Sequence, residues 1–407
     1  MATQGNDIIF GTQGNDTNLN GLGGNDTIYG LGGNDIINGG TGNDIIDGGT
    51  GIDNMNGGDN NDTYFVDNIG DIAAESFNDA LGGIDTVNSS VTHTLGFGIE
   101  NLNLTGSAAI NGTGNSNNNT INGNSAANII NGGAGADKMN GRDGNDTYFV
   151  DNIGDIAAES FNDAFGGIDT VNSSVTHTLG FGIENLNLTG SAAVNGTGNS
   201  NNNTINGNSA ANTIKGGGGA DTLNGANGND TILGEDGNDI ILGGPGQDTL
   251  NGGAGKDILS GNAGSDKFVF DLRDTANADS ILDFSHQDDT IVLANNLDTG
   301  ILGGAINPGI KGLVFVDSNN VSGNIPGNTL SPNWYFEGPG WDGDNPLQSG
   351  ESGLSGIYVN TTNGEIWYNP TDNDLNDIYA PSDAELIGKV DASVAASLDH
   401  TDFVYGA

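Results

Sequence analysis

Apolar residues recur every nine positions through two long stretches of this chain, with few other apolar residues around them. In "GGGGADTLNGANGNDTILGEDGNDIILGG", residues 216–244, an Asp stands every nine residues and is followed two positions later by Leu or Ile, and Gly and Asn fill most of the remainder. A nine-residue unit with one inward side chain is too short for a helical hairpin but suits a short strand and a tight turn. The glycines allow the positive φ angles and close backbone approach that such turns need.

Two such units form one coil of a flattened solenoid, so turns eighteen residues apart stack on the same edge, roughly 4.8 Å apart. The predicted fold is all-β: a parallel β-roll or β-solenoid of nonapeptide repeats, interrupted by duplicated β spacer modules and followed by a C-terminal β domain. The predicted inward positions are Ile9, Ile28, Ile37, Ile46 and Met55 in the first array, and Leu223, Ile232, Ile241, Leu250 and Leu259 in the second.

A second repeat, of 84 residues, divides the chain into segments. Residues 61–128 and 145–212 differ at two positions only, Leu81 against Phe165 and Ile110 against Val194. All three Trp residues lie beyond residue 267, where the nine-residue spacing has ended and the composition changes. The predicted segments are an N-terminal roll (1–62), a first spacer module with Asn-rich turns (63–146), its second copy (147–212), a second roll (213–266) and a C-terminal β region (267–407).

Within the spacer module, "DTVNSSVTHTL" alternates apolar and polar residues and predicts a strand. His93, and His177 in the second copy, lie on the apolar side of it, which predicts partly covered strand histidines rather than metal or catalytic groups. The acidic residues Asp71, Glu75 and Asp79 of the same module are expected to be solvated surface.

The charge of the chain points to cations as partners. Eight Lys and Arg against 53 Asp and Glu leave a formal net charge of −45, which repels nucleic acids and anionic membrane surfaces. There is no Cys for disulfides or zinc-thiolate sites. No apolar stretch approaches membrane-spanning length, and the start, "MATQGNDIIFG", lacks the pattern of a cleaved signal peptide. We expect no nucleic-acid binding and no membrane insertion.

The Asp of each nine-residue unit, the Asp slot, is the candidate metal ligand. Stacking brings these carboxylates to about 5 Å from one another, where each pair repels by roughly 3 kcal/mol at an effective dielectric of about 20. Carboxylates and Gly carbonyls form an all-oxygen shell that favours several Ca²⁺ ions over Mg²⁺, which demands a tighter octahedron. The predicted ligands are Asp7, Asp16, Asp26, Asp35, Asp44, Asp53, Asp62, Asp137, Asp146, Asp221, Asp230, Asp239, Asp248, Asp257 and Asp266.

"GGTGNDIIDGG" (39–49) and "GGAGKDILSG" (252–261) resemble the RTX, or hemolysin-type, calcium-binding repeat. The resemblance implies a parallel β-roll with calcium between successive turns, and export by type I secretion machinery that reads a C-terminal signal. The segment after the repeats, "FVFDLRDT", and the hairpin pattern "GIYVNTTNGEIWYNPTDND" (356–374) resemble the C-terminal region of serralysin-type proteases and related RTX proteins. Asp402, followed by Phe403, Val404 and Tyr405, resembles the end of type I substrates; an ordinary final strand is the alternative.

Some Asp slots depart from the repeat. Asn119 and Asn128, like Asn203 and Asn212 in the second copy, offer an oxygen without a charge. These turns are expected to continue the solenoid as Asn ladders that bind calcium weakly or not at all. Asp137 restores the acidic slot together with Asp146, but only for two turns, so any site there is expected to be incomplete.

Several common catalytic motifs are absent from the sequence, although its many acids leave open a carboxylate pair for glycan cleavage. The four His residues, at 93, 177, 286 and 400, stand too far apart for a zinc-protease helix, and there is no G-x-S-x-G elbow. We therefore expect a secreted calcium-binding β-roll that folds on extracellular Ca²⁺ and has a structural or interaction role at the cell surface or in the matrix, rather than an enzyme. The alternatives are a secreted enzyme with an unrecognised site in the C-terminal region and a glycan- or ice-binding solenoid.

Overall fold

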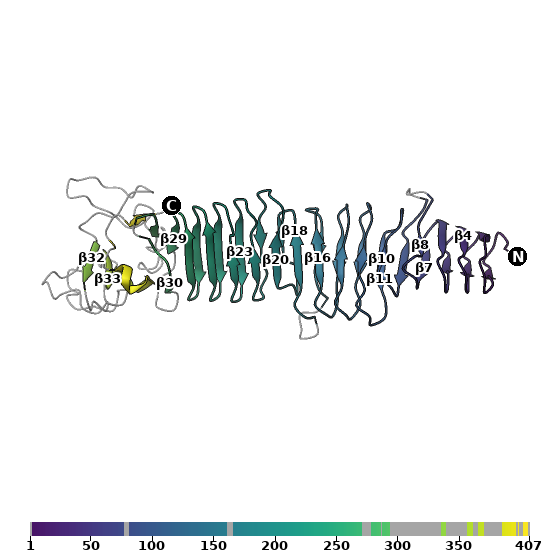
Figure 1. The fold of residues 1–407 in the computed structure, drawn as a ribbon, viewed down its shortest axis with the longest axis horizontal. Coiled ribbons are helices and arrows are strands. Elements are labelled where there is room, and N and C mark those ends of the chain that lie inside the picture. The colour runs from purple at the N-terminus through teal and green to yellow at the C-terminus, as the bar shows by residue number, and fades with distance from the viewer. Residues whose placement is uncertain are drawn as a thin grey trace, which may run out of the picture. The chain divides into compact units, whose positions relative to one another are not determined.

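The protein folds as two compact units, residues 1–189 and residues 190–407, built almost entirely from short parallel strands (Figure 1). A computed structural model describes residues 2–76, 81–160, 166–270, 278–285, 287–293, 335–338, 356–360, 365–369, 385–395, 398 and 402–405. Across these residues the one helix is α1 (Ala392–Ala395). The prediction of an all-β parallel solenoid is confirmed.

The strands of the first unit form three stacks in which each strand pairs with the strand two positions along the chain. Its longest sheet holds β1 (Ile8–Phe10), β3 (Thr27–Tyr29), β5 (Ile45–Asp47), β7 (Thr63–Val66), β9 (Thr86–Ser89), β11 (Asn101–Leu104), β13 (Thr120–Asn122), β15 (Lys138–Asn140) and β17 (Ile156–Ala157). A second stack holds β2 (Leu19–Gly23), β4 (Ile36–Thr41), β6 (Asn54–Asp59) and β8 (Ile72–Ala73). A third holds β10 (His93–Thr94), β12 (Gly112–Thr113), β14 (Ile129–Asn131), β16 (Thr147–Val150), β18 (Thr170–Ser173) and β20 (Asn185–Leu188). The remaining strand of this unit is β19 (His177–Thr178).

The second unit continues this pattern and ends in a different one. One stack runs through β21 (Gly196–Thr197), β23 (Thr213–Gly218), β25 (Thr231–Asp236), β27 (Thr249–Ala254), β29 (Lys267–Phe270), β31 (Thr290–Leu293) and β36 (Phe403–Tyr405). The other holds β22 (Thr204–Asn206), β24 (Thr222–Asn224), β26 (Ile240–Pro245), β28 (Ile258–Ala263), β30 (Asp279–Ile281), β35 (Glu385–Lys389), β34 (Glu365–Asn369), β33 (Gly356–Asn360) and β32 (Tyr335–Gly338).

Each repeat places one apolar side chain in a narrow core between the stacks. Ile28 pairs with Ile46, and Ile46 pairs with Tyr64, so the inward positions align at steps of eighteen residues. These side chains are fully buried, whereas the preceding residue in the strand faces out, as Ile45 does with 43% of its surface exposed. Burying one Ile or Leu stabilises the folded state by about 1.5–3 kcal/mol. The core is therefore one side chain wide, and each repeat adds a modest amount to its stability.

The spacer modules keep the stacked register although their coils differ in length. Thr63 of β7 pairs with Thr86 of β9, a step of 23 residues, and Thr86 pairs with Asn101 of β11, a step of 15. His93 is buried in β10, as expected for a covered strand histidine. The spacer therefore interrupts the nine-residue phase of the sequence and not the stacking of strands.

Part of the C-terminal region also stacks on the second roll. β31 pairs in parallel with β29 and with β36, and Phe403 of β36 is fully buried. The strands β33 and β34 pair antiparallel, as the hairpin pattern predicts, while Asn363 and Gly364 of its turn lie outside the described residues. Within the described part of the chain, no helix has the length and apolar character to cross a membrane.

Candidate cation sites in the turns

The carboxylates of the Asp slots form rows along the edges of the stacks because each carboxylate is fixed by the turn before it. Oδ1 of Asp44 accepts a hydrogen bond from the backbone N–H of Asp26 at 2.7 Å, and Oδ1 of Asp62 accepts one from Asp44 at 2.7 Å. The same contact links Asp239 to Asp221 at 2.8 Å and Asp248 to Asp230 at 2.7 Å. One oxygen of each carboxylate is thereby used in holding the stack together.

The second oxygen of these carboxylates is buried and accepts no hydrogen bond. A buried carboxylate oxygen without a donor is costly, and such atoms in folded proteins call for a partner such as an ion or water. This arrangement is found for Oδ2 of Asp26, Asp35, Asp44, Asp53, Asp62, Asp85, Asp137, Asp146, Asp169, Asp221, Asp230, Asp239, Asp248 and Asp266.

Backbone carbonyl oxygens of the glycines converge on the same places. A Cβ built on Gly225 would lie 2.5 Å from Oδ2 of Asp230 and 2.5 Å from the carbonyl oxygen of Gly243. Only a glycine leaves this space open, and the two oxygens bordering it belong to successive coils. A carboxylate and a carbonyl facing each other with no donor between them fit a hard cation, and Ca²⁺ accepts six to eight such oxygens in flexible geometry.

Burial shifts the titration of the slot carboxyls. Desolvation raises the pKa of Asp44 and Asp248 to about 6 and that of Asp221 to about 7, although the N–H bond from the preceding coil acts in the opposite direction. Neighbouring acids make a smaller contribution to these raised pKa values. The rows therefore favour whatever neutralises them, a proton or a metal cation.

Asp7 and Asp16, at the start of the chain, differ from the other slots. Oδ2 of Asp7 accepts bonds from the backbone N–H of Thr3 at 2.6 Å and from its hydroxyl at 2.8 Å. Thr12 donates to Oδ2 of Asp16 in the same way, at 2.6 Å and 3.0 Å. Both predicted ligands already have donors on the oxygen that the other slots leave unpaired.

In the Asn-containing slots, the amide group supplies its own hydrogen bonds. Nδ2 of Asn119 donates to the carbonyl oxygens of Ile99 at 2.9 Å and Glu100 at 3.2 Å, and its Oδ1 accepts from the N–H of Asn115 at 2.8 Å. The NH₂ group thus faces the preceding coil, where Oδ1 stands in the Asp turns, and the uncharged amide oxygen on the side of the Gly132 carbonyl already accepts the N–H of Asn115. This agrees with the expectation of weak or absent calcium binding at these turns, which stays a prediction.

The rows of acids run further than the predicted ligands: Asp71 and Asp155 keep the nine-residue spacing after Asp62 and Asp146, and two later acids leave it. Oδ1 of Asp71 accepts from the N–H of Asp53 at 3.0 Å, and Oδ1 of Asp155 accepts from Asp137 at 2.9 Å. Asp279 and Asp289 continue the rows beyond Asp257 and Asp266 in the second unit, at 3.1 Å and 2.9 Å. The acidic slot at Asp137 and Asp146 is therefore followed by further acids and does not end after two turns.

The expectation that the spacer acids are solvated surface is wrong for Asp71 and Glu75, which are 5% and 6% exposed; Asp79 lies outside the described residues. Asp71 was missed although it lies nine residues after Asp62, and Glu75 lies outside the slot spacing. The next slot acid after Asp62 in its own row, Asp85, was missed because the coil between them has 23 residues. The signal that finds Asp85 is local: "DTV" at 85–87 repeats the order of an Asp with an apolar residue two positions later.

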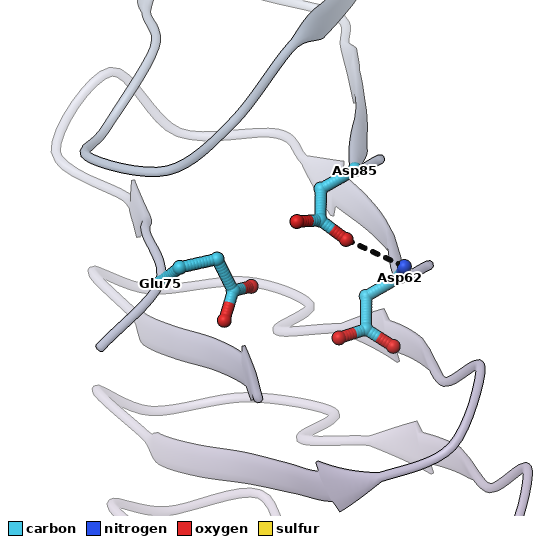
Figure 2. Close-up of side chains that lie close together, drawn as sticks. All are labelled: Asp62, Glu75 and Asp85. Carbon is cyan, nitrogen blue, oxygen red and sulfur yellow. Dashed lines mark hydrogen bonds between the residues drawn. The ribbon is translucent and has the colours of Figure 1, made fainter. Parts of the chain in front are cut away.

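The densest group of acids combines two slot residues with a glutamate of the spacer. One carboxylate oxygen from each of Asp62, Glu75 and Asp85 lies within 4.8 Å of the other two, and Figure 2 shows the three side chains gathered from neighbouring coils. At that distance two ionised carboxylates repel by about 3.5 kcal/mol at an effective dielectric of about 20. Burial, together with a smaller contribution from nearby acids, raises the pKa of Asp62 to about 9 and that of Asp85 to about 8.

A parallel β-solenoid with rows of buried carboxylates facing glycine carbonyls defines a β-roll of the calcium-binding class. The sequence profile of the RTX calcium-binding nonapeptide repeat (four copies) matches residues 1–17, 18–46, 38–68, 113–148, 197–232 and 233–268. These segments of the chain therefore carry RTX calcium-binding nonapeptide repeats. The profile also matches the Asn-containing turns, so it does not distinguish slots that carry Asp from slots that carry Asn.

One solved structure that is similar to the chain is the solution structure of the AlgE6R3 subunit from the Azotobacter vinelandii mannuronan C5-epimerase. The sequence identity is 21%, the TM-score is 0.20, and the match covers 50% of this chain and 78% of that chain. No curated protein matches the chain.

Proposed function

We propose that this protein is secreted and folds when calcium enters the Asp slots outside the cell, where it acts as a structural or interaction element at the cell surface or in the matrix. The observation that carries the proposal is the repeated buried Oδ2 without a donor, in slots where a glycine carbonyl of the next coil is the neighbouring group. The RTX repeats support calcium as the ion.

The charges of the chain explain why folding depends on the ion. Without a cation, stacking brings ionised carboxylates to within one coil spacing of one another, and the eight Lys and Arg are too few to compensate 53 acids. Bound calcium supplies positive charge and completes the oxygen shell. Because the folded state alone arranges the slots, binding stabilises it by mass action.

The slot residues then act in three ways. In a slot such as Asp44, Oδ1 accepts the N–H of the coil before it, Oδ2 faces the ion, and the apolar residue two positions later, Ile46, closes the core beneath. A non-enzymatic role is part of the proposal, since the sequence has neither a zinc-protease helix nor a nucleophile elbow. Export by type I machinery through a signal ending at Phe403–Tyr405 is also part of it.

A calcium titration of chelator-treated full-length protein, followed by far-UV circular dichroism with magnesium as the control, tests this proposal. We expect β-structure to appear cooperatively as calcium rises to millimolar levels, with magnesium unable to replace it. A β-signal already complete in chelator and unchanged by calcium would refute calcium-dependent folding.

A further inference from the structure

Each spacer module contributes a side chain to the turn that precedes it. We name the group Asp62, Glu75 and Asp85 the junction cluster; its copy consists of Asp146, Glu159 and Asp169. In the ordinary turns, a glycine carbonyl faces the slot carboxylate, as Gly57 faces Asp44. The equivalent position for Asp62, thirteen residues after it, is Glu75, whose side chain brings a third carboxylate into the turn.

The hydrogen bonds within the junction cluster leave two oxygens without donors. Glu75 is held by the N–H groups of Gly57 at 3.3 Å and Gly58 at 2.8 Å, and Oδ1 of Asp85 accepts from the N–H of Asp62 at 2.7 Å (Figure 2). Oδ2 of Asp62 and Oδ2 of Asp85 accept none, and these residues are 1% and 0% exposed. The same two oxygens, those of Asp146 and Asp169, are buried without donors in the second copy.

A tyrosine aligns the glutamate. Tyr64 stands where the preceding turns of the first roll carry Ile or Met, and its hydroxyl accepts from the N–H of Gly57 at 2.6 Å and donates to Oε1 of Glu75. Tyr148 makes both contacts with Gly141 and Glu159 in the second copy. The spacer thus supplies the third acid, and the last residue of the roll's core fixes its orientation.

We propose that each junction cluster is a calcium site distinct from the nonapeptide sites, with three carboxylates in place of the usual two, which fills at lower calcium concentrations than the turns of the roll. The proposal rests on the proposed function in taking calcium as the ion. Affinity in all-oxygen calcium sites rises with the number of charged ligands and with the rigidity of the site. The junction cluster has one carboxylate more, and Tyr64 and Gly58 hold it in place. Tyr64 and Tyr148 are positioning residues.

The test compares the full-length protein with the Glu75→Gln/Glu159→Gln variant. Gln keeps the size of Glu and removes one charge from each cluster. Glu235→Gln makes the same change at an exposed position, and Asp239→Asn removes an ordinary slot carboxylate. Calcium bound per chain is measured by titration calorimetry, and terbium(III) is used as a probe whose emission is sensitised by a nearby tyrosine.

We expect the Glu75→Gln/Glu159→Gln variant to lose the two tightest calcium ions, one per cluster, and most of the tyrosine-sensitised terbium emission, while Glu235→Gln changes neither. Unchanged tight binding in the double variant, with binding lost in Asp239→Asn, overturns the junction site and leaves the proposed function standing. Absence of calcium binding in the unmodified protein overturns both.

A Tyr64→Phe/Tyr148→Phe variant covers the case in which the glutamine variant does not fold, because it keeps all three carboxylates of each cluster. Its sensitised terbium emission is expected to fall at least severalfold, and its two tight calcium ions are expected to bind more weakly as Glu75 and Glu159 lose their alignment. Emission and tight binding equal to those of the unmodified protein would refute the site.

Discussion

Replacing Gly225 by Ala tests the slot geometry without changing any charge. The added Cβ would lie 2.5 Å from both Oδ2 of Asp230 and the carbonyl oxygen of Gly243, closer than real Cβ contacts. Gly218→Ala is the matched control, because a Cβ there meets only Cα of Ser200, at 3.9 Å. Both glycines lie in the second roll, and neither has a positive φ angle.

Two terms set the size of the effect. Overfilling a packed site costs about 1–3 kcal/mol. Loss of one calcium site removes about 2.7 kcal/mol when free calcium is 100 times its Kd. The sum, about 4–6 kcal/mol, corresponds to a fall in Tm of roughly 10–20 °C at about 2–4 °C per kcal/mol for a unit of this size.

The assay is thermal unfolding by circular dichroism in saturating calcium, together with the calcium concentration at half-folding. Gly225→Ala is expected to lower Tm by that amount and to raise the half-folding concentration, while Gly218→Ala stays within about 0.5 kcal/mol of the unmodified protein, as most surface changes do. Equal behaviour of the two variants would refute the assignment of the space beside Gly225 to a cation.

Three further predictions concern the amide turns, proton binding and the core. Asn119→Ala is expected to lower the free energy of unfolding by about 1–3 kcal/mol through lost hydrogen bonds without changing the calcium bound per chain, whereas Asp137→Ala is expected to reduce the calcium bound. Thermal unfolding measures the stability of each variant and calorimetry its bound calcium. Equal loss of calcium in both variants would contradict the assignment of Asn119 to a turn without calcium. In chelator, burial raises the pKa of Asp62 to about 9 and that of Asp44 to about 6, from 3.8, so the folded state binds more protons than the unfolded state and its stability falls as pH rises from about 4 through these values. Circular dichroism in chelator is therefore expected to show more β-structure at pH 5.5 than at pH 8, and the reverse order would contradict this sign. Met55 is fully buried in the core, and Met55→Ala is expected to lower the free energy of unfolding by about 2–5 kcal/mol. Ile52 is half exposed, and Ile52→Ala is expected to lower it by about 0.5 kcal/mol or less. Denaturant unfolding in calcium measures both, and similar losses would place Met55 outside the core.

The roll itself could be predicted from the sequence because its period is short and strict. One Asp and one apolar residue per nine determine both the turn and the inward side chain, and Asp44 with Ile46 lies as expected. Parallel stacking of identical turns then follows from backbone pairing, which needs no further sequence signal.

The junction cluster could not be predicted in this way because its members do not share a period. Asp62 and Asp85 are 23 residues apart, and Glu75 reaches the turn from the opposite stack. The contact of Tyr64 with Glu75 depends on where coils of unequal length place their side chains, which only the structure provides. The near identity of the two spacer copies does not distinguish Glu75 and Tyr64 from the rest of the module, because almost all of its residues are repeated.

The most direct test of calcium binding in the turns is a crystal structure grown in calcium, with anomalous difference maps recorded at long wavelength. The account predicts peaks between successive carboxylates of the Asp rows and in both junction clusters, and none at Asn119 or Asn128, where the amides are hydrogen-bonded. Empty Asp rows, with water or protons satisfying Oδ2, or peaks at the Asn turns as strong as those at the Asp turns, would contradict it.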